Sequence, residues 1–139
     1  MALNQIYAPT QALQREVPVT ANTQPGVPIL VGARPAVTVT AAGGATKTQT
    51  TGLPSTMTSV TWKNGGIGNA TDNATVAFDG TWEFAVTGAT TSTLSAVEVF
   101  FVSGGTLSLT SSGNTHYGWT DYPRDYRKTN ARAAVRIGA

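Results

Sequence analysis

The sequence predicts an all-β fold, and three observations favour it. Charged residues make up 12% of the chain, about half the usual share, and Thr, Gly and Ala fill the gap. Thr and Val favour strands, and frequent Gly favours turns over helices. The stretch "TVAFDGTWEFAVT" (75–87) places its large apolar residues at even positions only, as one face of a strand requires. With 139 residues, the chain is expected to form one domain.

The composition also excludes several kinds of site and segment. The chain contains no cysteine, so it forms no disulfide and no thiolate metal site. The N-terminus lacks the charged and apolar regions of a signal peptide. No run approaches the roughly 18 apolar residues of a membrane span. We therefore expect a soluble protein with no membrane partner.

Charges are distributed unevenly along the chain, although the net charge is only +2. Every charged residue between positions 64 and 120 is acidic, whereas the segment 121–139 is mainly basic. The acidic residues are Asp72, Asp79, Glu83 and Glu98, and the basic ones are Arg124, Arg127, Lys128, Arg132 and Arg136. The tail of one molecule could therefore meet the acidic body of another molecule, or an acidic partner surface.

Residues 1–26 are polar, interrupted by prolines and without clear periodicity, so we expect an extended N-terminal arm. Two interpretations apply to this arm. It is either a disordered terminus or a tether that orders on a partner by strand addition. We favour the tether, whose candidate anchors are Leu3, Ile6, Tyr7 and Leu13.

The body of the protein begins at residue 27 with two strand-like segments. These are "VPILVG" (27–32) and "AVTVTA" (36–41). A polar, glycine-containing loop is expected over 42–55, followed by a further strand at 56–62 and a turn-rich segment.

The stretch 75–87 contains Asp79-Gly80, a dipeptide typical of two-residue hairpin turns. A turn there would place Glu83 on the same face as Phe78. One long strand running through Gly80 instead keeps all large apolar residues on one side. We therefore predict a single strand with a bulge or close backbone contact at Gly80.

The next two runs, "AVEVFFV" and "TLSLT", predict a hairpin with its turn at Gly104-Gly105. In that register Val102 faces Leu107. Phe100 likewise faces Leu109, and these residues form the buried face.

The opposite face of this hairpin carries Val97, Val99 and Phe101 and is also apolar. A sheet with two apolar faces needs a second sheet, barrel closure or a neighbouring subunit to cover it. We take these residues as candidates for an oligomer interface. After them, "THYGWTDY" (115–122) predicts a strand, and "ARAAVRI" predicts a last strand that buries alternate residues, namely Ala133, Val135 and Ile137.

From residue 27 onward, the order of these segments resembles a family of phage proteins. The segments are "VPILVGARPAVTVTAA", "ATVAFDGTWEFAVTGA", "AVEVFFVSGGTLSLTSSGNTHYGWTDY" and "AAVRIG". They are similar to the small capsid decoration (cement) proteins of tailed phages, the DUF2190 family. The shared patterns are an early "P-V-L-V-G" element, a central "V-x-x-x-G-x-[FW]-x-[FL]" strand, a "GN" turn followed by "x-x-x-G", and a closing "V-x-V" strand.

The resemblance implies a compact antiparallel β-barrel-like or β-tulip-like domain over 27–139. The arm 1–26 precedes this domain and carries no motif of the family. Family members are structural proteins without cofactors. They sit as homotrimers on the capsid exterior at three-fold positions and clamp major capsid proteins together. Another virion β protein, such as a tail-tube or head-completion protein, is an alternative.

The segment "GNTHYGWTDYPRDYRK" (113–128) contains the only histidine, His116, and invites a search for catalysis. On one strand His116 and Asp121 would face opposite sides, so we expect no enzyme. A single histidine without cysteine also argues against a metal site. Tyr117 and Trp119 would share a face that suits core or interface packing. A carbohydrate-binding module that uses these two rings with Tyr122 is an alternative.

The basic run "PRDYRKTNAR" contains Arg124, Arg127 and Lys128. Its first interpretation is a solvated loop, and the second is a set of salt bridges to an acidic capsid or a neighbouring subunit. Nucleic acid is the least favoured partner, because Asp125 interrupts the run and Asp121 precedes it.

Overall fold

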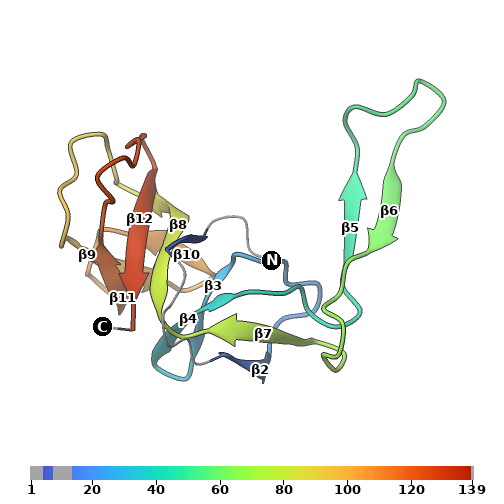
Figure 1. The fold of residues 1–139 in the computed structure, drawn as a ribbon, viewed down its shortest axis with the longest axis horizontal. Helices are drawn as coiled ribbons and strands as arrows, with labels where there is room; N and C mark the ends of the chain where they lie inside the picture. Colours follow the sequence, from blue (N-terminus) through green and yellow to red (C-terminus); the bar gives the residue numbers. More distant parts are fainter. Residues whose placement is uncertain (1–4, 8–13, 139) are drawn as a thin grey trace.

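A computed structural model describes residues 5–7 and 14–138, and these residues form an all-β fold without a helix (Figure 1). The strands make a closed barrel, a four-stranded sheet beside it, and a two-stranded hairpin that projects from the sheet. The predicted fold class is therefore confirmed.

The barrel is built from five strands of the C-terminal half: β8 (Gly80–Thr87), β9 (Glu98–Val102), β10 (Thr106–Ser108), β11 (Thr115–Thr120) and β12 (Arg132–Ile137). Their order is β8-β10-β9-β11-β12, and β12 pairs again with β8 to close the barrel. All pairs are antiparallel except β10 with β8. The short strand β1 (Gln5–Tyr7) adds to the N-terminal half of β8.

The barrel is filled by large apolar side chains from every one of its strands. These are Trp82, Phe84, Val86, Val99, Leu107, Tyr117, Ala133, Val135 and Ile137. The prediction for β12 is confirmed, because Ala133, Val135 and Ile137 are all buried.

The four-stranded sheet has the order β2 (Gln14–Pro18), β7 (Asn73–Ala77), β4 (Arg34–Thr38), β3 (Pro28–Val31), and all its pairs are antiparallel. Its smaller core contains Val17, which is 5% exposed. The expected boundary after residue 26 is therefore wrong, because β2 is an integral strand of this sheet. Only residues before 14 remain candidates for a separate arm.

The segment 75–87 forms neither the hairpin nor the single strand considered from the sequence. β7 and β8 belong to different sheets and do not pair, and the chain bends at Phe78 and Asp79. Gly80 continues the bend with a φ of 103°, a conformation that favours glycine. Phe78 and Trp82 are both buried, as their even positions predicted, but they do not share one side: Phe78 enters the sheet core and Trp82 enters the barrel core.

The expected loop over 42–55 is also wrong, because it contains β5 (Thr46–Gln49). This strand pairs with β6 (Val60–Lys63), which begins later than the strand predicted at 56–62. β5 and β6 form the projecting hairpin of Figure 1.

The hairpin between β9 and β10 has a register one residue away from the predicted one. Val102 pairs with Thr106 and Phe101 with Leu107, because the turn contains three residues rather than two. Val99 is fully buried, and Phe101 packs against the barrel core. Barrel closure therefore covers the second apolar face. The expectation that Val99 and Phe101 form an oligomer interface is wrong for this reason, and Val97 is half-buried beside them.

Candidate interaction surfaces

Strand β11 contains a bulge that decides where its aromatic side chains point. The register with β9 shifts between His116 and Gly118, so Tyr117 is the extra residue. Tyr117 enters the barrel core, where its ring lies 5.9 Å from that of Phe84. Trp119 points outward, so the prediction that Tyr117 and Trp119 share a face is wrong.

The outer face of β9 and β11 carries a surface that we call the aromatic patch, made of Phe100, His116, Trp119 and Glu98. The His116 ring lies 4.5 Å from that of Trp119 and 5.8 Å from that of Phe100. All three rings are half-buried, and the Nε2 atom of His116 is buried without a hydrogen-bond partner among the described residues. Glu98 pairs with Trp119 in the sheet and is exposed. The patch is thus largely apolar with one carboxylate at its edge.

Because of the same bulge, His116 and Asp121 do not face opposite sides of the strand, as their sequence spacing had predicted. Trp119 is paired with Arg136, whose guanidinium lies 3.8 Å from the Asp121 carboxylate. Cross-strand partners share a face, so Asp121 and His116 both lie on the outside of the barrel. Asp121 accepts a hydrogen bond from Thr81 and pairs with Arg136, so its carboxylate is engaged by other groups.

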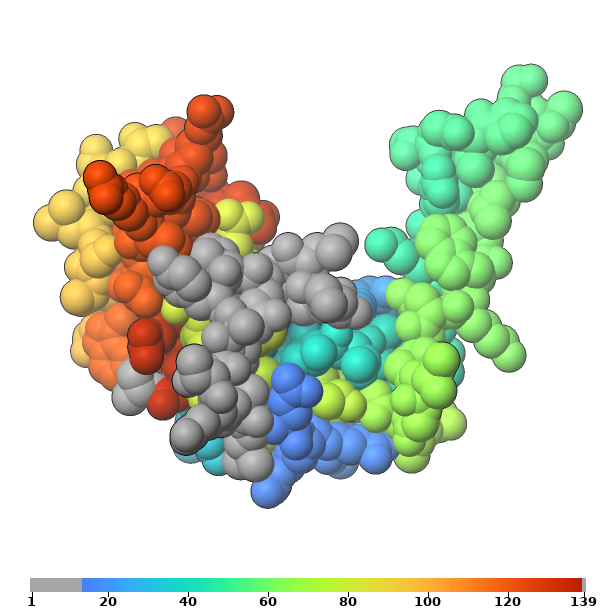
Figure 2. All heavy atoms as spheres, in the orientation of Figure 1, coloured from blue at the N-terminus to red at the C-terminus, as the bar shows by residue number. Residues whose placement is uncertain are grey.

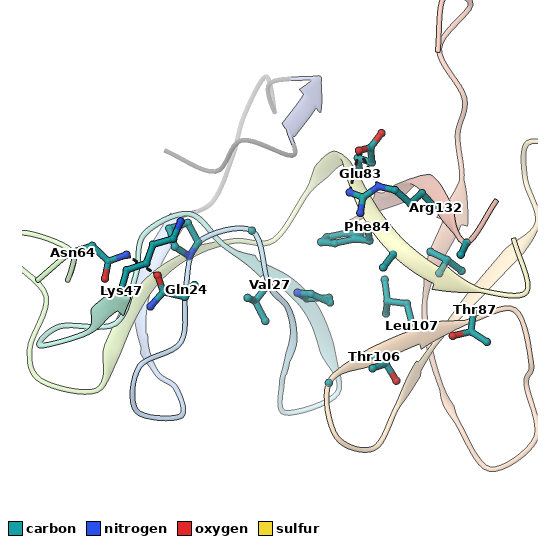
Figure 3. Close-up of a pocket in the computed structure, with 17 residues that line it drawn as sticks. Gln24, Val27, Lys47, Asn64, Glu83, Phe84, Thr87, Thr106, Leu107 and Arg132 are labelled. Atoms are coloured by element: carbon teal, nitrogen blue, oxygen red, sulfur yellow. Dashed lines mark hydrogen bonds and ion pairs between the residues drawn. The ribbon is translucent and has the colours of Figure 1, made fainter. Parts of the chain in front are cut away.

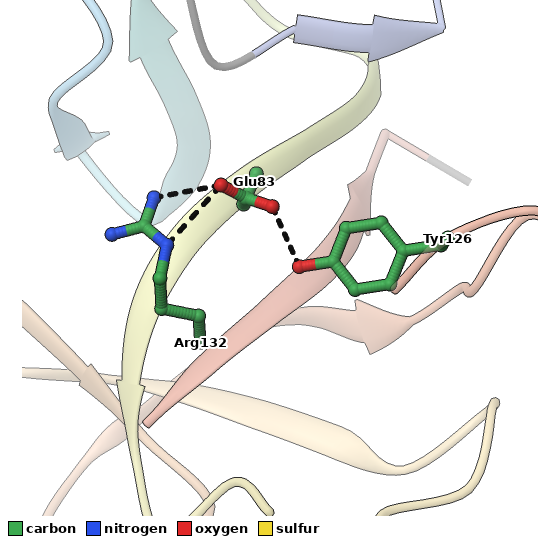
Figure 4. A network of polar contacts seen from close by, with 3 residues as sticks. All are labelled: Glu83, Tyr126 and Arg132. Atoms are coloured by element: carbon green, nitrogen blue, oxygen red, sulfur yellow. Dashed lines mark hydrogen bonds and ion pairs between the residues drawn. The ribbon is translucent and has the colours of Figure 1, made fainter. Parts of the chain in front are cut away.

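The loop after β11 is anchored to the barrel by a polar network around Glu83 (Figure 4). Arg132 donates two hydrogen bonds of 3.2 and 3.0 Å to one oxygen of the Glu83 carboxylate. The Tyr126 hydroxyl donates a 2.7 Å hydrogen bond to the other oxygen. Burial raises the pKa of Tyr126, and the hydrogen bond to Glu83 raises it further.

Lys128 fixes the same loop at a second point. Its ammonium donates a 2.7 Å hydrogen bond to the Thr93 carbonyl oxygen and lies 4.5 Å from the centre of the Tyr122 ring. The interpretation of this loop as solvated is therefore wrong for Lys128 and agrees with the exposure of Arg124 and Arg127. Lys128 is engaged within its own chain, whereas Arg124 and Arg127 are exposed.

A groove of about 720 Å³ lies between the barrel and the root of the projecting hairpin (Figure 3). Figure 2 shows the wide hollow above it, between the barrel and the hairpin. One wall carries Gln24, Lys47 and Asn64, and the other carries Glu83 and Arg132, which are paired to each other. Among the described residues, no cluster of His, Asp or Glu side chains has the arrangement of a metal site.

The anchors proposed for the N-terminal tether fall mostly beyond the described structure. Leu3 and Leu13 lie outside the described residues, and Ile6 and Tyr7 belong to β1, of which only the backbone is described. β1 and β2 both add to sheets of their own chain.

Comparison with known proteins gives no relative, since no family model, curated protein or solved structure matches the chain. The resemblance to the decoration proteins therefore depends on the sequence patterns alone. Within the part of the chain that the structure describes, no helix of the length and hydropathy needed to span a membrane is found.

Proposed function

We propose that this chain is a structural capsid decoration protein that binds the outer surface of a phage head as a homotrimer and stabilises contacts between major capsid subunits. The observation that carries the proposal is the order of strand motifs that resembles this family. In this sequence the glycines of two of those motifs have specific structural tasks, which supports the resemblance.

Gly118 is the glycine of the pattern in which "GN" is followed by "x-x-x-G". A β-carbon at this position would collide with the carbonyl oxygen of Arg136 in the neighbouring strand β12. Gly80, the glycine of the central strand pattern, has a φ of 103° where the chain passes from one sheet to the other. Both glycines are thus required to close the barrel and to join it to the sheet.

A non-catalytic role fits the surroundings of the titratable side chains. His116 is packed between Phe100 and Trp119. Glu83 is bound by Arg132 and Tyr126, and Tyr117 is only 1% exposed. Because Tyr117 is in the core, it forms no sugar-stacking platform with Trp119 and Tyr122, and we do not propose the carbohydrate-binding alternative.

The proposed function is tested by mixing the purified protein with assembled shells of the major capsid protein from the same phage genome. We expect saturable binding, density at three-fold positions in particle images, and shells that resist heat better than bare shells. Free capsid subunits that have not assembled serve as the control, because a cement site built across several subunits is incomplete on them. The absence of binding to any shell surface would refute the proposal.

A further inference from the structure

The β5–β6 hairpin is the part of the molecule with the least contact to its own body. Its strands pair only with each other among the described strands, and both of its faces are exposed to solvent. An isolated two-stranded hairpin is only marginally stable in water. A hairpin that extends from a folded domain in this way is therefore suited to contact another surface.

The root of this hairpin is held in one direction by polar contacts to the loop 19–26. The Thr46 amide donates a 2.8 Å hydrogen bond to the Asn22 side chain, and Gln24 donates one of 3.2 Å to the Thr46 carbonyl oxygen. Asn64, directly after the end of β6, donates a 2.6 Å hydrogen bond to Gln24. The hairpin is thus presented at a fixed angle, which reduces the entropy lost when it binds.

One face of the hairpin combines apolar groups with a positive charge. Lys47 lies directly opposite Trp62, and Gln49 lies opposite Val60, so these four side chains share a face. Trp62 is 42% exposed, an unusual position for so large a ring. The other face carries Thr48 and Thr61, whose hydroxyls are 2.8 Å apart, and Lys63.

The aromatic patch has the complementary chemistry. It offers half-buried rings beside Glu98, and no ion pair joins Glu98 to any other described residue. A lysine beside an exposed tryptophan thus matches a carboxylate beside half-buried rings.

We propose that the β5–β6 hairpin of one copy docks on the aromatic patch of a second copy, with Trp62 against the rings and Lys47 paired with Glu98. Strands β9 and β11, which carry the patch, and the β5–β6 hairpin lie towards opposite ends of the longest axis of the molecule (Figure 1). A hairpin therefore cannot reach the patch of its own chain. The contact is head-to-tail, and repeated head-to-tail contacts produce either a closed ring or an open filament. A ring of three copies is the closed form that the proposed function requires.

This inference rests on the self-association included in the proposed function, but not on capsid attachment. It is tested by charge exchange in the full-length chain, with sedimentation velocity over a concentration series. Lys47→Glu and Glu98→Lys should each weaken association by about tenfold. The double variant K47E/E98K should restore it, because the pair is then attractive again. Lys63→Glu, on the other face of the hairpin, is the matched control and should associate as the wild type does.

A covalent readout is available because the chain contains no cysteine of its own. Treated with a bismaleimide whose spacer matches the reach of a Lys–Glu pair, the variant K47C/E98C should form cross-linked species that end at a trimer. The matched pair K63C/E98C should remain largely unlinked, since position 63 lies on the other face of the hairpin.

A wild-type protein that stays monomeric, single variants that associate normally, or a double variant that fails to recover would each overturn the inference. Binding of the same variants to capsid shells separates the two proposals. If the charge-exchange variants still bind shells and their self-association is unchanged, the hairpin contact is refuted and the proposed function is not. If the double variant regains self-association but neither it nor the wild type binds shells, the hairpin contact is supported and the proposed function is refuted.

Discussion

The hydroxyl of Tyr117 donates a 2.6 Å hydrogen bond to the carbonyl oxygen of Ala36, and this bond joins the barrel to the four-stranded sheet. Both residues are buried. Tyr117 reaches Ala36 because the bulge in β11 turns its side chain into the barrel, where its ring packs against Phe84 and Phe101. One side chain therefore couples the two halves of the domain.

Replacing Tyr117 with Phe should lower the free energy of unfolding by about 1 kcal/mol, because it removes a buried hydrogen bond and keeps the ring. The measurement is denaturant unfolding of the two proteins. Tyr122→Phe is the matched control: the Tyr122 hydroxyl is buried without a hydrogen-bond partner among the described residues, so its removal should be neutral or stabilising. An equal loss in both variants would contradict the assigned role of the Tyr117 hydroxyl.

The protein should lose stability in alkaline solution. Burial raises the pKa of Tyr117, and burial together with the Glu83 hydrogen bond raises that of Tyr126, above the unfolded value of about 10. Groups whose pKa is raised by folding contribute full stability below the unfolded pKa. That contribution is lost as the pH rises through 10.0 and towards the folded values. Unfolding free energies measured at increasing pH should therefore fall above this point.

The variant Tyr126→Phe measures how much of the alkaline loss of stability comes from Tyr126 and its hydrogen bond to Glu83. The variant should be less stable than the wild type near neutral pH, because it lacks the hydrogen bond to Glu83. Its stability should then fall less steeply at high pH, since one raised pKa is gone. Parallel curves for the two proteins would show that Tyr126 is not linked to folding.

Gly118→Ala should destabilise the barrel by about 3 kcal/mol. The added methyl group would collide with the Arg136 carbonyl oxygen and lie 3.2 Å from a side-chain carbon of Ile137, both in strand β12. A backbone oxygen fixed by a closed barrel cannot move away at low cost. The control is Gly32→Ala, whose β-carbon meets no atom within 4 Å and whose φ of 64° costs about 1 kcal/mol. Thermal unfolding of both variants measures the difference, and equal effects would contradict the prediction.

Much of the fold was predictable wherever a strand has one buried and one exposed face. The large residues at the even positions of 75–87 and the alternate residues of β12 were identified correctly as core from their period of two, although the smaller Ala77, Thr81 and Ala134 between them are buried as well. β5 left no such signal. Both faces of its hairpin are exposed, so its polar residues are indistinguishable from those of a loop.

The errors at the surfaces come from shifts of a single residue. A three-residue turn in place of a two-residue turn moved Phe101 from the outer face to the face that packs against the barrel core. The bulge at Tyr117 then reversed the parity of everything after it in β11 and brought Trp119 next to His116. Such shifts exchange the two faces of a strand, and no local residue pattern predicted them. The aromatic patch was therefore accessible only from the structure.

Two truncations of the N-terminus, one ending at residue 13 and one at residue 20, should separate capsid attachment from folding stability. Deleting residues 1–13 removes the proposed tether anchors and the short edge strand β1 but keeps β2 and the five strands of the closed barrel, so the protein should stay folded and self-associated but bind capsid shells more weakly. Deleting residues 1–20 also removes β2. Val17 then leaves the sheet core, β7 loses its neighbour, and Glu16 no longer accepts the 2.6 Å hydrogen bond from the Ala70 amide.

The longer deletion should therefore lower the unfolding temperature clearly, whereas the shorter one should not. The loss of a buried valine alone costs roughly 1.5–3 kcal/mol. Val17→Ala in the full-length chain is the matched control: it weakens the same core and leaves the tether in place, so it should lower stability without lowering shell binding per folded molecule. If the shorter deletion binds shells as tightly as the full-length protein, the tether is wrong, because every proposed anchor lies within the deleted segment.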